Sequence, residues 1–121
     1  MKKIIDSNIL IYSYKDFIQL RGIFRDTSVY LSEISKMETL GFHQLKQDEK
    51  QYFVHIFEKN NIITIDSEII DRAIELKQKQ KMSIGDAIIA ATALIYDLEI
   101  ITRNTKDFEK IKGLKATNPL I

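Results

Sequence analysis

Four acidic side chains of this sequence lie beside short apolar runs, where they could act together. Asp6 ends the run IIDSN, Glu38 lies in SEISKMETL, and Asp86 heads SIGDAIIAATAL. The fourth, Asp107, lies in ITRNTKDF. Carboxylates that converge repel one another unless a cation lies among them. Mg²⁺ and Mn²⁺ prefer such oxygen ligands, and they orient a phosphodiester and activate water. If the acids converge, the pattern predicts phosphodiester hydrolysis.

Each acid also has a structural interpretation. The segments 35–38 and 83–86 both fit the capping box S-x-x-[DE] of a helix N-terminus. Asn104 could cap the turn that contains Asp107, and Asp6 could end a strand by accepting bonds from nearby backbone amides. Asp86 can serve both purposes, because a helix N-terminus stabilises its charge by roughly 0.3–1 kcal/mol and leaves the side chain able to reach a metal.

The elements that position these acids are short apolar runs that alternate with helical patterns. Strands are predicted at 3–5, 29–31, 62–65, 99–102 and 114–116. Helical segments are predicted at 9–14, 17–24, 34–41, 52–57, 69–76, 84–96 and 108–111, with Asp66 as a cap. This alternation predicts an α/β domain with a mainly parallel sheet of four to five strands, covered by helices on both faces. Sites in such folds lie beyond the carboxyl ends of the strands.

Length and composition exclude several classes of protein and of metal site. A chain of 121 residues predicts one domain, residues 1–121. The absence of cysteine excludes thiolate metal sites, and two isolated histidines give no zinc pattern. No apolar run reaches the roughly 20 residues that span a bilayer, and the N-terminus lacks a signal-peptide pattern, so a cytoplasmic protein without membrane association is expected. The net charge of +1 gives no strong sign of a nucleic-acid binder.

Aromatic side chains follow the first predicted helix closely, in YSYKDF. They are Tyr12, Tyr14 and Phe17. Aromatic rings can stack on bases, but this spacing equally fits packing in the core or in a dimer.

Along nearly its whole length the sequence contains, in this order, the segments DSNILIY, SEISKMETLGF, SIGDAIIAATAL, ITRNTKDF and GLKATNPL. It resembles the PIN domain family and, within it, the VapC-type ribonuclease toxins. The resemblance implies a three-layer sandwich, with a parallel sheet between helices. A haloacid-dehalogenase-like phosphatase also places Asp after its first strand, but it needs a second Asp where this chain has Asn8.

The resemblance also implies roles for individual residues. Asp6, Glu38 and Asp86 become the acidic triad, and Asp107 adds a fourth catalytic and metal-binding carboxylate. The implied supporting residues are Ser7, Asn8, Thr102 and Asn104. Position 104 is Asn where many relatives carry an acid, which leaves Asn104 and Asp107 as competing candidates for the fourth corner. The basic residues expected to contact RNA are Lys15, Arg103 and Lys106; the alternative is that these charges are solvated surface groups.

The function implied by the resemblance is Mg²⁺- or Mn²⁺-dependent endoribonuclease cleavage, commonly of structured RNA such as transfer RNA. The implied partners are a second copy of the chain, in a homodimer, and a small antitoxin protein. The alternative is a PIN-fold RNA-binding or scaffold protein without turnover. Retention of Asp6, Glu38 and Asp86 together favours the enzyme.

Overall fold

The computed structural model describes residues 1–121 and is built on a five-stranded sheet in which every pair of neighbours is parallel. The strand order is β3-β2-β1-β4-β5, so the first strand of the chain is central. The strands are β1 (Lys3–Ile5), β2 (Val29–Ser32), β3 (Asn61–Ile63), β4 (Glu99–Ile101) and β5 (Ala116–Thr117). The predicted parallel α/β sheet is confirmed.

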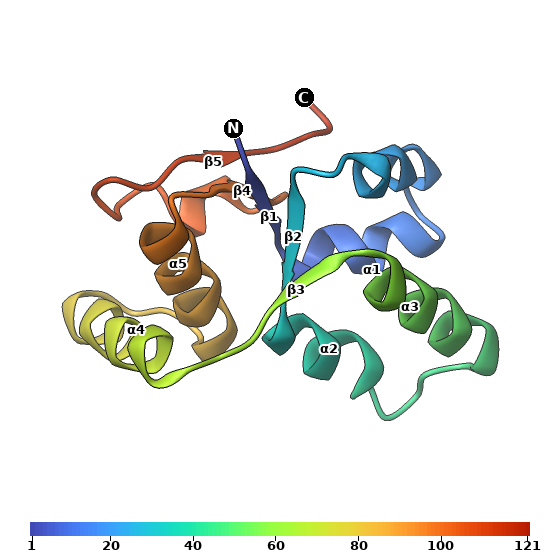
Figure 1. Ribbon diagram of the computed structural model, residues 1–121, viewed down its shortest axis with the longest axis horizontal. Helices are drawn as coiled ribbons and strands as arrows, with labels where there is room; N and C mark the ends of the chain where they lie inside the picture. The colour runs from blue at the N-terminus through green and yellow to red at the C-terminus, as the bar shows by residue number, and fades with distance from the viewer.

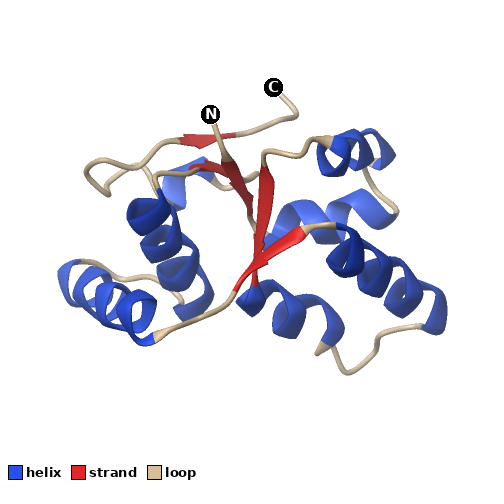
Figure 2. Cartoon of the chain, in the orientation of Figure 1, coloured by secondary structure: helices blue, strands red, loops and turns tan.

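Helices cover both faces of this sheet. They are α1 (Ser7–Tyr14), α2 (Glu33–Leu40), α3 (Gln47–Lys59), α4 (Ser67–Lys79) and α5 (Ile84–Tyr96), with 3₁₀ segments at Ile18–Arg25 and Thr105–Asp107. Figure 1 shows α4 and α5 on one side of the sheet and α1 and α3 on the other. Figure 2 shows the same arrangement as a layer of strands between helices. No helix is longer than 13 residues, and none is both long and apolar enough to cross a membrane.

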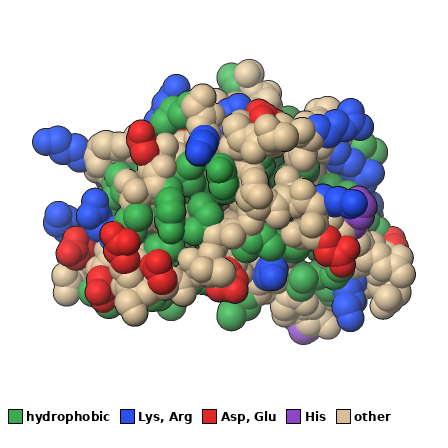
Figure 3. Space-filling view, viewed as in Figure 1, with side chains coloured by type: hydrophobic (Ala, Val, Ile, Leu, Met, Phe, Trp, Pro, Cys, Tyr) green, Lys and Arg blue, Asp and Glu red, His purple; other side chains and the backbone are tan.

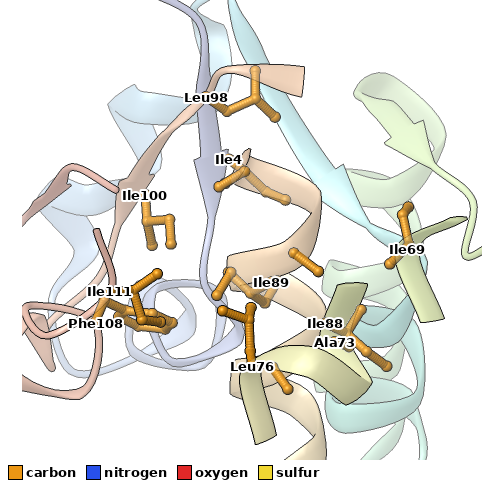
Figure 4. Close-up of a cluster of buried hydrophobic side chains, with 14 residues drawn as sticks. Ile4, Ile69, Ala73, Leu76, Ile88, Ile89, Leu98, Ile100, Phe108 and Ile111 are labelled. Carbon is orange, nitrogen blue, oxygen red and sulfur yellow. The ribbon is translucent and has the colours of Figure 1, made fainter. Parts of the chain in front are cut away.

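Successive residues of each central strand point to opposite faces, which divides the core in two. Ile4 and Ile100 join a cluster of 14 buried residues with α4 and α5 (Figure 4). Ile5 and Ile101 join a second cluster of 10 buried residues with α1 and α3. A strand that is buried on both faces reads as a continuous apolar run, and the pairs Ile4–Ile5 and Ile100–Ile101 show this pattern after the charged residues Lys3 and Glu99.

The helix α5 is the most deeply buried helix of the fold. Ala87, Ala90 and Ala91 are fully buried, and their small side chains let the sheet and α4 approach closely. The charge of Asp86 therefore lies at the N-terminal mouth of a buried helix, as the sequence predicts. The predicted Asp66 cap is also confirmed, since the Ile69 amide donates a 2.9 Å hydrogen bond to Asp66 Oδ1.

The boundaries near the C-terminus differ from the prediction. The helical turn expected at 108–111 begins earlier, at Thr105–Asp107, and continues as turns with Phe108 buried in the core. The last strand is Ala116–Thr117 rather than 114–116. The Leu114 amide bonds to the Ile111 carbonyl within a turn, so it cannot pair with β4. The helical pattern at 17–24 forms a 3₁₀ helix, Ile18–Arg25.

Candidate active site

Asp6 lies at the point where the neighbouring strands β1 and β4 end. It directly follows β1, and Thr102 directly follows the neighbouring strand β4. The Asp6 amide donates a 2.9 Å hydrogen bond to the Ile101 carbonyl, which continues the sheet pairing to this position. The Thr102 hydroxyl donates to Asp6 Oδ2 at 2.8 Å, although the two residues are 96 positions apart. The parallel topology thus brings the two predicted residues together.

The Asp6 carboxyl group is held in a buried environment, with the residue only 7% exposed. Burial raises its pKa from 3.8 to about 6, and the charges of Asp86 and Glu38 add to this, while the Thr102 hydrogen bond opposes it. Asp6 occupies the N-cap position of α1 but makes no capping hydrogen bond through its side chain. The strand-ending interpretation of Asp6 therefore does not account for its position.

The Thr102 hydroxyl connects Asp6 to the predicted supporting residues. It accepts hydrogen bonds from Asn8 Nδ2 at 3.3 Å and from the Asn104 amide at 3.0 Å. Asn8 Oδ1 in turn accepts from the Arg103 amide at 3.4 Å. A hydroxyl has one hydrogen and two acceptor lone pairs, so every position on Thr102 Oγ1 is used. These contacts fix the start of α1 to the segment after β4.

Glu38 is positioned by a pair of serines. The Ser7 hydroxyl donates to Glu38 Oε1 at 2.6 Å and lies 2.8 Å from the Ser35 hydroxyl. The capping box predicted from Ser35 is wrong. The N-cap of α2 is Ser32, whose hydroxyl accepts from the Ile34 amide at 3.1 Å. Ser35 lies within the helix, where it supports the Ser7–Glu38 contact.

Asp86 combines a capping role with a place beside the other acids. Ser83 is the N-cap of α5, and its hydroxyl accepts a 3.1 Å hydrogen bond from the Asp86 amide, as the capping box predicts. Partial burial raises the pKa of the Asp86 carboxyl group, and the charges of Asp107 and Glu38 raise it further. Gly85 lies directly against Glu38, because a methyl group at this position would overlap Glu38 Oε2.

Asp107 lies at the outer end of the acidic group. Together with Asp86 and Lys106 it lines a cleft of about 680 Å³. Asn104 precedes the 3₁₀ turn Thr105–Asp107 but makes no capping hydrogen bond through its side chain. The turn is closed instead by a 3.0 Å bond from the Asp107 amide to the Asn104 carbonyl. Both polar side chains at this corner are therefore available for other contacts.

Two of the predicted RNA-contacting residues lie elsewhere. Lys15 lines a separate hollow with Arg21. The Arg103 guanidinium lies over the rings of Tyr12 and Phe17, 4.3 and 4.8 Å from their centroids. The rings of Tyr12, Tyr14 and Phe17 are half-buried against the α1–α3 cluster, which favours the packing interpretation over base stacking.

The acidic group offers the ligand atoms that a hard divalent cation prefers. Its ligand atoms are carboxylate oxygens, without sulfur or imidazole nitrogen, which fits Mg²⁺ or Mn²⁺. No three acidic or histidine side chains are arranged as ligands of one ion. Mg²⁺ is commonly bound by only one or two carboxylates and keeps several waters, so the group fits such an ion.

Comparison with known proteins bears directly on this arrangement. The family model described as the PIN domain matches residues 3–114. The chain belongs to the PIN domain family. Ribonuclease VapC of Rickettsia bellii (strain RML369-C) is 30% identical to this PIN domain over 132 aligned positions, which cover 99% of this chain and 98% of the relative.

Solved structures agree with this assignment. A toxin–antitoxin complex from Klebsiella pneumoniae contains a chain that is 34% identical to this PIN domain, with a TM-score of 0.77 and coverage of 93% of this chain and 95% of that one. VapBC2 from Rickettsia felis, bound to a DNA fragment from its promoter, also gives a TM-score of 0.77, at 21% identity and 98% coverage of both chains. The second likeness shows the fold alone.

Proposed function

We propose that this protein is an endoribonuclease, the toxin of a toxin–antitoxin pair, and that it hydrolyses RNA with Mg²⁺ or Mn²⁺. In this proposal the cation is held among Asp6, Glu38, Asp86 and Asp107, and one or two of these carboxylates bind it directly, as is usual for Mg²⁺. The observation that carries the proposal is electrostatic. Burial raises the pKa of both Asp6 and Asp86, and neighbouring acids add to it: Asp86 and Glu38 at Asp6, and Asp107 and Glu38 at Asp86. Four acids brought this close favour a cation among them.

The relatives support RNA as the substrate and a protein as the partner. The Rickettsia bellii relative is a ribonuclease, and the Klebsiella pneumoniae structure is a toxin–antitoxin complex. Both cover more than nine-tenths of this chain. A homodimer is part of the same proposal, and the exposed side chains of Ile11 and Ile18 provide apolar surface for a second copy.

The side chains of this chain would prepare the reaction by fixing oxygen atoms. Thr102 donates to Asp6 Oδ2, which leaves Oδ1 for the cation, and Ser7 donates to one oxygen of Glu38. A bound divalent cation supplies Lewis-acid chemistry, since it polarises a phosphoryl oxygen and lowers the pKa of water. Asp86 and Asp107 extend the negative charge into the cleft, where a scissile phosphate has room to enter.

The test is cleavage of transfer RNA by the purified chain in a chelator and after addition of Mg²⁺ or Mn²⁺. Cleavage is expected only with the metal, and Asp86→Asn should abolish it. Cleavage by Asp86→Asn at the parent rate would contradict the assignment of the site. Binding of RNA without cleavage in either metal would instead support the scaffold alternative.

A further inference from the structure

The cleft beside the acidic group has a mostly charged and polar lining, in which Met82 is the only hydrophobic residue. Lys81, from the loop between α4 and α5, forms part of one wall. Lys106 and Lys110, from the segment after β4, line it as well. Two of the four acids share this lining, so positive charge is placed next to the proposed cation site.

A second hollow, of about 380 Å³, continues the cleft. It shares Gln80 and Lys110 with the cleft and adds further basic residues from α4 and from the turn before β5. We call the basic side chains of the two hollows together the basic track. Its members are Lys81, Lys106, Lys110, Lys112, Lys79 and Arg72. Figure 3 shows Lys and Arg side chains along the left edge of the molecule, beside the loop that precedes β5.

None of these cations is engaged in an ion pair. The two ion pairs of the structure join Lys3 to Asp26 and Lys115 to Glu99. The loop that carries Lys81 is held in place by another lysine, because Lys77 Nζ donates a 2.7 Å hydrogen bond to the Met82 carbonyl. The basic track is therefore a group of charges without ion-pair partners, and the loop that carries Lys81 is anchored.

We propose that the basic track binds the backbone phosphates of the RNA strand on one side of the scissile bond. The strand then runs from the acidic group, between the α4–α5 loop and the turn Thr105–Asp107, toward α4. This inference rests on the proposed function and adds the path of the substrate. Protein partners bury a central apolar anchor in most interfaces, and the cleft offers only Met82 for that purpose. The apolar residues that line the second hollow are already packed in or against the buried core, namely Leu76, Leu94 and Ile111. A polyanion needs only the charges.

The experiment measures binding of a fluorescein-labelled single-stranded oligoribonucleotide by anisotropy, in a chelator so that the RNA stays intact, over a series of salt concentrations. Lys81→Gln, Lys106→Gln and Lys110→Gln should each weaken binding. Each should also reduce the slope of log K against log salt by about 0.7, the value for one phosphate contact on a single strand. Lys50→Gln, an exposed lysine on α3, is the matched control and should keep the parent slope.

Slopes of the track variants that overlay the parent, or an equal reduction in Lys50→Gln, would overturn the inference. The inference would also be overturned if the variants lose binding of an acidic peptide but keep the parent's salt slope for RNA, because the basic track would then bind a protein partner. Cleavage of RNA by the parent chain is measured separately. Parent RNA cleavage with unchanged track slopes refutes the path alone, whereas track-dependent binding without cleavage in any metal refutes the proposed activity alone.

Discussion

The acidic site has two halves that differ in how they are built. The inner half consists of Asp6, Ser7, Glu38 and Thr102, where buried hydroxyl groups hold the carboxylate oxygens at 2.6 and 2.8 Å. The outer half consists of Asp107 and the lysines of the cleft, which face solvent, and the half-buried Asp86 lies between the two halves. Asp6 is buried, whereas Asp107 is exposed.

The difference separates two tasks. Hydrogen bonds and burial fix the carboxylate atoms in the inner half. The same burial raises the pKa of the Asp6 carboxyl group to about 6 in the protein alone. Charges in the outer half are solvated, which weakens each interaction but lets the side chains adapt to a long polyanion. Substitutions in the inner half should therefore reduce catalysis strongly, and those in the outer half should act more weakly.

The largest effect is expected for Asp6→Asn. It should abolish metal-dependent cleavage and raise the melting temperature of the metal-free protein at pH 7, because a buried and repelled charge is removed while Oδ1 of Asn still accepts from Thr102. RNA cleavage and thermal unfolding measure the two effects. Asp71→Asn, on exposed α4 surface, is the control and should change neither.

The free energy of unfolding of the parent and that of Asp6→Asn should also depend differently on pH. Because the pKa of Asp6 is raised from 3.8 to about 6 in the folded state, the folded chain binds more protons than the unfolded chain between these values. The free energy of unfolding should fall as pH rises through this range, with Asp6 contributing on the order of 2–3 kcal/mol. Denaturant unfolding of parent and Asp6→Asn between pH 4 and 7 isolates this contribution. Parallel curves would contradict it.

The next effect is expected for Ser7→Ala, which removes the hydrogen bond to Glu38. Loss of such a supporting contact reduces metal affinity or activity by about 10- to 100-fold. Ser13→Ala is the control, because Ser13 is also buried on α1 but bonds to the Leu10 carbonyl and Tyr52. The Mn²⁺ dependence of cleavage should shift for Ser7→Ala only. Equal shifts in both variants would mean that general loosening of α1 is responsible.

A smaller effect is expected for Gly85→Ala. The added methyl group displaces the Glu38 carboxylate, whose flexible end can move, so folding is preserved. Helix propensity favours Ala over Gly by roughly 1 kcal/mol, and the melting temperature should stay equal or rise. Cleavage and Mn²⁺ affinity should still fall, by about 10-fold. Gly22→Ala, where a methyl group meets nothing, should keep both. Full activity of Gly85→Ala would show that the position of Glu38 is not critical.

The smallest effect is expected for Asp107→Asn, in the solvated outer half. Its charge contributes to the raised pKa of Asp86, so its neutralisation should weaken metal binding at the low end of the 10- to 100-fold range. Glu109→Gln, an exposed neighbour outside the cleft lining, is the control. A Mn²⁺ titration of Asp107→Asn that overlays the parent would reduce the site to three acids.

Much of the fold could be predicted because burial on both faces leaves a clear pattern. The strand β1 and the apolar helix Ile84–Tyr96 lie where the sequence predicts them, and the strand predicted at 99–102 ends one residue earlier, at Ile101. The prediction of one domain over residues 1–121 stays a prediction; the family match spans residues 3–114. The ends of the last strand could not be predicted, because a single turn bond at Leu114 decides where pairing begins.

The candidate site was predictable where topology alone controls it. Asp6 and Thr102 meet because they follow neighbouring parallel strands. Ser35 was misassigned, because S-x-x-E describes a cap only if β2 ends directly before it, and β2 ends at Ser32. Gly85 gave no signal, since its role is the space it leaves for Glu38. The catalytic roles of these residues stay predictions.

The contact between Asp6 and Thr102 has a consequence for when activity can arise during synthesis. Asp6 is among the first residues made, but its hydrogen-bond donor and the strand β4 beside it come from the far end of the chain, 96 positions later. A nascent chain that stops before β4 has neither the central strand pair nor the donor. On the proposed role of Asp6 in catalysis, we expect activity only after most of the chain has left the ribosome, so that unfinished chains leave the RNA around them intact.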